Sequence, residues 1–278
     1  DPIFIFVFDM GVAGAAIATV LSQILSAVWM FVFLTGRKAI IKLHVKNVHF
    51  DGKIVKSITK LGFAGFVMNA SNGLVQITAN NTLGNYGGDI YVGIMTVLTS
   101  VRDLVSLPTQ GINNAAQPVI GYNLGAEKPE RIRSAIRFVT PVSAIYMLAV
   151  WLLIFLFPKP IMSIFNSDAQ LLAKGASAMH IYFFGFFMMA FHFVGQCVFV
   201  GLGKSKQATF FSMLRKVFVV VPLTILLPRV ASLGVNGVFL AEPISNFISG
   251  ILCYATMLHT VRKICKATEK TGEGVIDV

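Results

Sequence analysis

Charged residues are scarce in this chain. They make up 13% of the sequence, whereas residues with hydrophobic side chains make up 55%. A water-soluble domain carries roughly twice that share of charge, so the composition excludes an ordinary soluble globular protein. The sequence therefore predicts an integral membrane protein.

Cysteine and enzyme motifs are also scarce. The three cysteines, Cys197, Cys253 and Cys265, lack the spacing of a zinc or redox site, and we expect free thiols. The chain has no HExxH sequence and no recognisable Ser, His and Asp set, and the GKS tripeptide at 203–205 lacks the first glycine and the strand of a P-loop. We expect no enzyme activity, no metal site and no cofactor.

The chain begins without a methionine and without the basic stretch that opens a signal peptide. The short apolar run 2–8 has the character of a cut helix end. We therefore expect this sequence to be part of a longer protein.

Long apolar stretches dominate what is present. About 20 apolar residues cross a hydrocarbon core roughly 30 Å thick, and the stretches lack the ten-residue alternation of barrel strands. The predicted fold class is an all-α polytopic membrane protein with seven transmembrane helices. The predicted spans are 11–34, 61–83, 90–110 with an extension to about 124, 138–157, 178–202, 208–228 and 234–258.

The net charge of +11 reflects basic residues that gather in alternate connections between these spans. They lie between 34 and 61, between 127 and 137, after 258, and after the span 178–202 as Lys204, Lys206, Arg215 and Lys216. The positive-inside rule makes this side cytoplasmic, together with the carboxyl terminus. Because the charge would face anionic lipid along a membrane surface, it does not indicate nucleic acid.

An internal repeat links the two ends of the chain. Residues 11–26, GVAGAAIATVLSQILS, align without gaps with residues 234–249, GVNGVFLAEPISNFIS. Both helices would run in the same direction through the membrane, so the repeats are parallel. The first helix would end one six-helix lobe and 61–258 would form the next. Chance similarity between two apolar helices rich in small residues is the alternative.

The second helix of this lobe ends in AAQPVIGYNLGA before a basic turn, and the last helix opens with GVNGVFLA. In these features the chain resembles the multidrug and toxic compound extrusion (MATE) transporters over nearly its whole length. The resemblance implies a pseudo-twofold twelve-helix transporter. This chain would hold the end of the amino-terminal lobe (1–34), a cytoplasmic linker (35–60), the carboxyl-terminal lobe (61–258) and a cytoplasmic tail (259–278).

The resemblance also implies a function and a partner. The protein would be a cation-coupled antiporter of the bacterial inner membrane that exports amphipathic, often cationic, drugs and toxic compounds against inward Na⁺ or H⁺ flow. Its partners would be the lipid bilayer, the small-molecule substrates and the missing amino-terminal lobe.

Three charged residues inside the predicted spans are candidates for ion coupling. Arg102 and Asp103 would lie ~19 Å below the outer end of their helix, just past the midplane. Neighbours point about 100° apart on a helix, so we expect each to need a partner elsewhere. Glu242 precedes Pro243, which frees the carbonyl of Phe239 beside a carboxylate that can hold Na⁺ or a proton. For Arg102 and Asp103 the alternative is a structural pair that locks the bundle. For Glu242 it is a carboxyl that is kept neutral by burial or paired with Arg102.

Amide side chains on the span 61–83 are candidates for substrate binding. Their spacings of three and four residues place them on one helix face, where they could line a cavity or form hydrogen bonds between helices. These residues are Asn69, Asn72, Gln76 and Asn80.

The span 178–202 holds the other substrate candidates. His192 and Gln196 lie one turn apart among phenylalanines and methionines that include Met188. Aromatic and thioether side chains suit a cavity for flat cations, although core or lipid packing explains them equally well.

Two other functions stay open. A flippase for a lipid-linked precursor could use similar lobes, but its cavity would need to be much more cationic than one arginine makes it. A non-transporting membrane scaffold would use the intramembrane acids only to hold its helices together.

Overall fold

The computed structural model describes residues 4, 8, 10–36, 51–166, 168–230 and 233–273. Apart from Phe4 and Phe8, the apolar run 2–8 lies outside the described residues, and so does most of the predicted linker. The described ranges are helical with no strand, which confirms the predicted all-α class. The chain forms two compact units, Asp1–Leu61 and Gly62–Val278.

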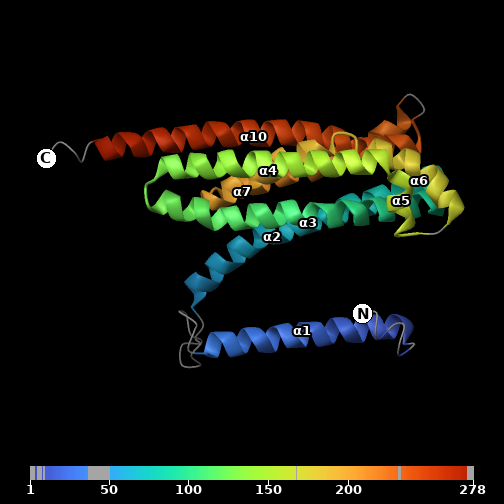
Figure 1. The fold of residues 1–278 in the computed structure, drawn as a ribbon, viewed down its shortest axis with the longest axis horizontal. Helices are drawn as coiled ribbons and strands as arrows, with labels where there is room; N and C mark the ends of the chain where they lie inside the picture. The colour runs from blue at the N-terminus through green and yellow to red at the C-terminus, as the bar shows by residue number, and fades with distance from the viewer. Residues whose placement is uncertain are drawn as a thin grey trace. The chain divides into compact units, whose positions relative to one another are not determined.

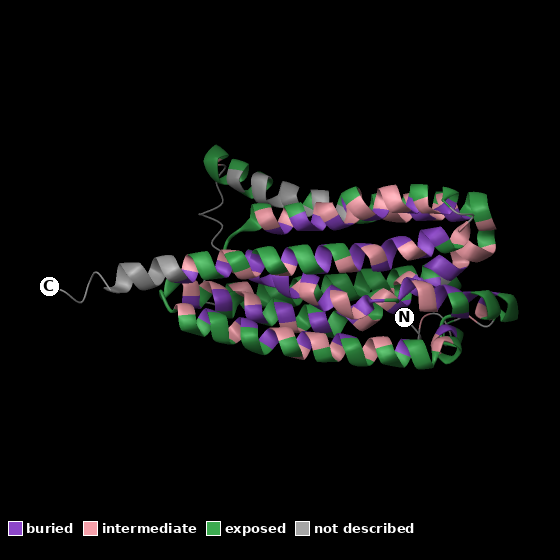
Figure 2. Ribbon diagram, turned by 90° about the horizontal axis from the view of Figure 1, so that it is seen from above, coloured by how far each residue is buried: buried purple, intermediate pink, exposed green. Residues whose placement is uncertain are grey.

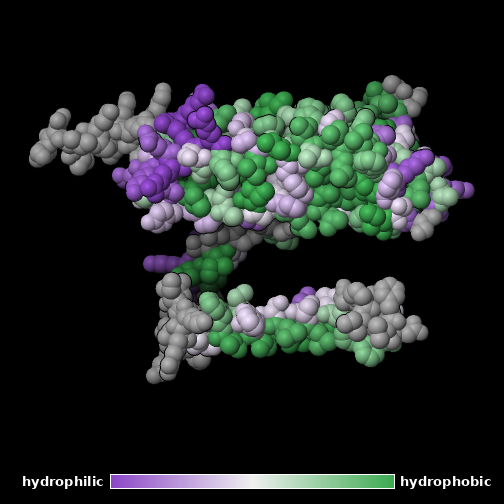
Figure 3. All heavy atoms as spheres, viewed as in Figure 1, coloured by the Kyte–Doolittle hydropathy of each residue, from purple (hydrophilic) through white to green (hydrophobic). Residues whose placement is uncertain are grey.

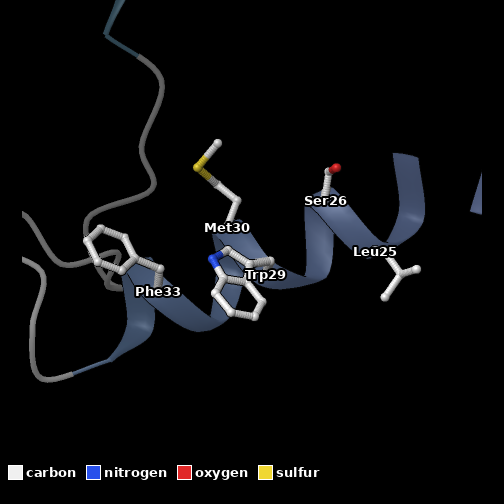
Figure 4. Close-up of a pocket in the computed structure, with 5 residues that line it drawn as sticks. All are labelled: Leu25, Ser26, Trp29, Met30 and Phe33. Atoms are coloured by element: carbon white, nitrogen blue, oxygen red, sulfur yellow. The ribbon is translucent and has the colours of Figure 1, made fainter. Parts of the chain in front are cut away.

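Helix α1 (Gly11–Thr35) in the first unit matches the predicted span 11–34. It is apolar around its circumference, and Trp29 is 80% exposed. A pocket of about 520 Å³ on this helix (Figure 4) is lined by Leu25, Ser26, Trp29, Met30 and Phe33. All of these side chains come from one helix, and a helix that is apolar all round needs lipid or neighbouring helices to cover it. We interpret this surface as one for helix packing.

The remaining helices follow in the order that Figure 1 colours from blue-green to red. The elements are α2 (Gly52–Gly87), α3 (Asp89–Gly125), α4 (Pro129–Leu156), α5 (Pro158–Ser163), α6 (Ala169–Tyr182), η3 (Phe186–Met188), α7 (Met189–Gly201), α8 (Ser205–Met213), the π-helical η4 (Leu214–Val220), α9 (Val221–Leu226), η5 (Leu227–Arg229) and α10 (Val235–Glu273).

The core of the second unit lies where α3, α4, α7 and α10 run side by side (Figure 1). One buried cluster includes Leu98, Phe183 and Phe239, and a second includes Ile120 and Phe199. Figure 2 shows buried residues on the inward faces of these helices and exposed residues on their outward faces. Figure 3 shows that the visible outer face of this unit is apolar along its middle and hydrophilic at both ends. This distribution suits a bundle whose middle is surrounded by lipid.

Within the described residues, five helices are long and apolar enough to cross a membrane, and α6 with the segment Phe186–Gly201 makes a sixth if this bent pair is one span. The predicted span 61–83 lies in α2, which does not meet the same criterion because its amides and glycines lower its hydropathy. The prediction of seven spans is therefore met only in part.

The predicted span 178–202 is not one straight helix. The chain bends by 46° between α6 and α7. Gly185 lies at the break with a φ of +73°, which an L side chain rarely adopts, and the ring of Phe247 packs directly against it. Tyr182, at the end of α6 just before the bend, is buried and contacts Arg102 of α3.

The two repeated segments begin with the same local geometry. Gly11 and Gly234 both have a φ of +52°. A side chain added at Gly14 would collide with the backbone of Phe4, and one added at Gly237 would collide with the backbone of Leu227. The residues that come close occupy corresponding positions in the two segments, so the repeat extends from sequence to backbone packing.

The placement of Arg215 and Lys216 in a cytoplasmic connection was wrong. Both lie in η4, in the middle of the apolar helical stretch Ser205–Arg229, and Arg215 is buried. Counting basic residues assigns them to the ends of spans, whereas these two are drawn into the bundle by partners on other helices. The remaining exposed basic residues of α4 and α10 stay at one end of the unit (Figure 3).

Candidate functional site

A cavity of about 640 Å³ lies inside the second unit and receives side chains from α2, α3, α7, α8, η4 and α10. Most of the residues proposed from the sequence line it together. The polar and charged lining residues are Asn72, Gln76, Arg102, Asp103, Ser106, Gln110, Gln117, His192, Gln196, Ser212, Arg215, Lys216 and Glu242.

Arg102 of α3 contacts side chains of two other helices, α6 and α10. Its Nε and Nη2 donate to Oδ1 of Asp103 at 3.1 and 2.9 Å, and its Nη1 donates to the hydroxyl of Tyr182 at 3.0 Å. The same Nη1 lies 3.7 Å from Oε1 of Glu242. The expectation that each neighbour needs a partner elsewhere holds for Arg102, which reaches Tyr182 and Glu242. It is wrong for Asp103, because the long arginine side chain folds back over its own helix to reach this carboxylate.

Asp103 and Glu242 differ in their access to the cavity. The side chain of Asp103 is 71% exposed and contacts one guanidinium group. The side chain of Glu242 is 7% exposed. Arg215 donates to its Oε1, and Nη1 of Arg102 lies 3.7 Å from the same oxygen. A cation that enters the cavity can therefore approach the exposed carboxylate of Asp103 and would compete there with one guanidinium group, whereas at the buried Glu242 it would meet two.

The π-helical stretch η4 presents two consecutive basic residues to the cavity. Arg215 faces Glu242 of α10, and its backbone carbonyl accepts a hydrogen bond of 3.2 Å from Ser245. Lys216 donates from Nζ to Oδ1 of Asn72 on α2. π-helical turns inside α-helices often mark functional sites, and this one shifts the helix register where both side chains turn inward.

The amide candidates divide into two groups. Asn72 and Gln76 line the cavity, whereas Asn80 accepts a hydrogen bond from Gln76 at 3.2 Å and lies outside the lining. The side chain of Asn69 lies outside the described part of the chain. Gln196 lines the cavity and donates to the carbonyl of Ala208 at 2.8 Å, so it also joins α7 to α8.

His192 and Met188 occupy different surroundings. His192 is buried at the cavity, and its Nδ1 has no hydrogen-bond partner within the described residues. Met188 does not line the cavity, whereas the neighbouring Met189 does. The backbone carbonyl of Met188 packs against Gly250. Cys197 and Cys253 are buried free thiols that do not line the cavity.

Sequence reasoning missed Tyr182, Arg215 and Lys216. The signal for Arg215 and Lys216 was their position well inside an apolar run, where a charged residue is costly unless it has a partner. Tyr182 offered no such signal, because its role depends on the bend at Gly185. Within the described ranges no group of three or more His, Cys, Asp or Glu residues could hold a metal ion.

A helical unit with an apolar outer face, an ion-pair network among its spans and a polar cavity between its helices has the architecture of a membrane transporter lobe. The MatE family model matches residues 65–226, which is more than half of the chain. The chain belongs to this family, the MATE transporters, and is a multi-pass membrane protein.

Characterised relatives are similar over most of this chain. The multidrug export protein MepA of Staphylococcus saprophyticus is 23% identical over 260 residues, which cover 91% of this chain and 56% of the relative. MepA of Staphylococcus aureus is 22% identical over the same shares. The chain therefore spans little more than half the length of these relatives.

Solved structures agree with the fold. An outward-facing multidrug resistance MATE transporter has a TM-score of 0.84 at 22% identity, covering 95% of this chain and 59% of that protein. An inward-facing MATE transporter has a TM-score of 0.78 at 21% identity, covering 95% of this chain and 61% of that protein.

Proposed function

We propose that the full-length protein is a cation-coupled exporter of amphipathic compounds in the bacterial plasma membrane, with the basic end of the lobe and the carboxyl terminus on the cytoplasmic side. The observation that carries this proposal is the cavity, in which charged and amide side chains from six elements meet inside an apolar bundle. The curated relatives are multidrug export proteins, which supports the same function for this chain.

Asp103 is the residue we assign to cation exchange. Its carboxylate is exposed to the cavity, and among the described residues its ion-pair partner is Arg102. Binding of Na⁺ or a proton would compete with this guanidinium, which could then move onto Glu242, 3.7 Å away. Exchange of Arg102 between the two carboxylates would link the occupancy of the cavity to the ion pair between α3 and α10.

Glu242 has a different role in this proposal. It holds Arg215 and faces Arg102, and it is buried between them. It therefore fixes the positions of the two guanidinium groups and the contact between η4 and α10. The substrate would lie against Asn72, Gln76 and Gln196, and the amino-terminal lobe would close the site from the opposite side.

A flippase for a lipid-linked precursor is the second candidate. A flippase would need a cavity that is more cationic than a single arginine makes it. In this cavity Arg215 and Lys216 add two basic residues to Arg102. A scaffold is less favoured, because a purely structural ion pair does not need Asp103 to be 71% exposed.

The function is tested in proteoliposomes that contain the full-length protein and an amphipathic fluorescent dye. An imposed Na⁺ or H⁺ gradient should drive dye movement, and collapse of the gradient with an ionophore should stop it. Dye movement that is the same in protein-free vesicles would reject export, and movement of a lipid probe but not of the dye would favour the flippase.

A further inference from the structure

The charged residues that line the cavity are not balanced. Three are basic, Arg102, Arg215 and Lys216, and two are acidic, Asp103 and Glu242. Each carboxylate already contacts a guanidinium group, Asp103 that of Arg102 and Glu242 that of Arg215. The cavity of this lobe therefore carries a surplus of positive charge after its internal pairs are counted.

Lys216 carries that surplus. Its ammonium group donates to the neutral amide oxygen of Asn72, and among the described residues it forms no salt bridge. An ammonium group has three donors and no acceptor, so a neutral amide leaves most of its hydrogen-bonding capacity unused, and its charge has no salt-bridge partner among the described residues. Arg215 likewise keeps a buried Nε without a hydrogen-bond acceptor within the described residues.

The rest of the lining suits a ligand with two different ends. Met189 and Phe193 supply apolar surface, and Phe193 is only partly buried. The amide of Gln76 lies on α2, the same helix as Asn72. A ligand that places an acid at Lys216 can therefore lay an apolar part along α7, which is a typical arrangement of a few polar groups in an otherwise apolar pocket.

We propose that this cavity, taken as the transport site proposed above, binds an anionic amphiphile whose acidic group pairs with the ammonium group of Lys216. A cationic compound would have to separate Arg102 from Asp103 and would meet like charge at Lys216. The ligand chemistry is a carboxylate, sulfonate or phosphate on an apolar body. Such a ligand can be a soluble amphiphile or the headgroup of an anionic lipid.

The test uses the purified full-length protein and two fluorescent probes. One is undecanoic acid with a dansylamino group at the end of its chain, and the other is the same dansylated chain ending in an amine. Fluorescence titration should show tighter binding of the acid than of the amine. Lys216→Gln should weaken binding of the acid about 10- to 100-fold, because a hydrogen bond between charged groups is lost.

Lys206→Gln is the matched control, since Lys206 is an exposed lysine on the neighbouring α8. It should leave the affinity for the acid unchanged, and Lys216→Arg should retain most of it. Equal affinity for the two probes, tighter binding of the amine, or equal effects of Lys216→Gln and Lys206→Gln would overturn the proposal. If Lys216→Gln does not fold, the proposal is tested by comparing the affinities of the wild-type protein for the acid and for the amine.

Nanodiscs distinguish the two sources of the anion. Phosphatidylglycerol that displaces the acid in a Lys216-dependent manner would identify a lipid headgroup, and its failure to do so would identify a soluble amphiphile. Lys216-dependent binding without any gradient-driven efflux would support this inference and reject export. Efflux of the amine alone, unaffected by Lys216→Gln, would reject the inference and retain export.

Discussion

Arg215 and Glu242 are separated by 27 residues in the sequence, and the guanidinium group of the first donates directly to the carboxylate of the second inside the bundle. Their side chains are only 6% and 7% exposed. The pair joins η4 to α10 and places Arg215 and Lys216 at the wall of the cavity. A buried pair of this kind is costly to break from one side, because the remaining charge loses its partner.

Glu242→Ala should therefore lower the free energy of unfolding by about 3–5 kcal/mol. The double variant Arg215→Met with Glu242→Leu should recover much of this loss, because apolar side chains of similar volume remove both charges. Chemical unfolding in mixed micelles measures the difference. A double variant that is no more stable than Glu242→Ala would show that the pair does not anchor η4.

Tyr182→Phe should lower the free energy of unfolding by about 1.5–3 kcal/mol, since Arg102 would lose a hydrogen-bond acceptor at a buried position. The hydroxyl oxygen of Tyr182 accepts from Arg102 at 3.0 Å, and Tyr182 is 1% exposed.

Tyr122→Phe provides the control for this loss, because Tyr122 is 76% exposed. Unfolding in the same micelles should show little change for it. Equal losses of unfolding free energy in both variants would show that the hydrogen bond from Arg102 to Tyr182 does not stabilise the protein.

The repeated glycines lead to a further prediction. A Cβ atom at Gly237 would lie 2.6 Å from the backbone of Leu227 and Pro228, which cannot move aside as a side chain can. Gly237→Ala should destabilise the protein by about 1–3 kcal/mol through overpacking.

Gly111→Ala is the matched substitution, because nothing lies within 4 Å of a Cβ atom there. It should stabilise α3 by about 0.5–1 kcal/mol, the usual gain from replacing glycine by alanine in a helix. Thermal unfolding of both variants checks the contrast. A stable Gly237→Ala variant would mean that the close approach is not required.

Much of the helical layout could be predicted from the sequence. α3 follows the predicted 90–124 closely, because a long apolar run with one ion pair has few other solutions in a membrane. Arg102, Asp103 and Glu242 line one cavity for the same reason, since charged groups within spans turn away from lipid.

The remaining features depend on contacts between helices that are distant in sequence. Lys216 lies in the cavity because Asn72 of α2 receives its ammonium group, and a local count of basic residues cannot detect this. The bend at Gly185 depends on a backbone conformation and on the ring of Phe247 from α10. The pairing of Arg102 with Asp103 depends on the rotamer of a long side chain, which helical periodicity does not determine.

The most direct test of Asp103 as the exchange residue is gradient-driven dye efflux from proteoliposomes of the full-length protein. Asp103→Asn should reduce this efflux about 10-fold or more, the usual range of a coupling free energy. Its stability should remain close to that of the wild type, because the Asp103 side chain is 71% exposed. Asp89→Asn, at the exposed start of the same helix, should leave efflux unchanged. Wild-type efflux in Asp103→Asn at equal protein density would contradict the role assigned to Asp103.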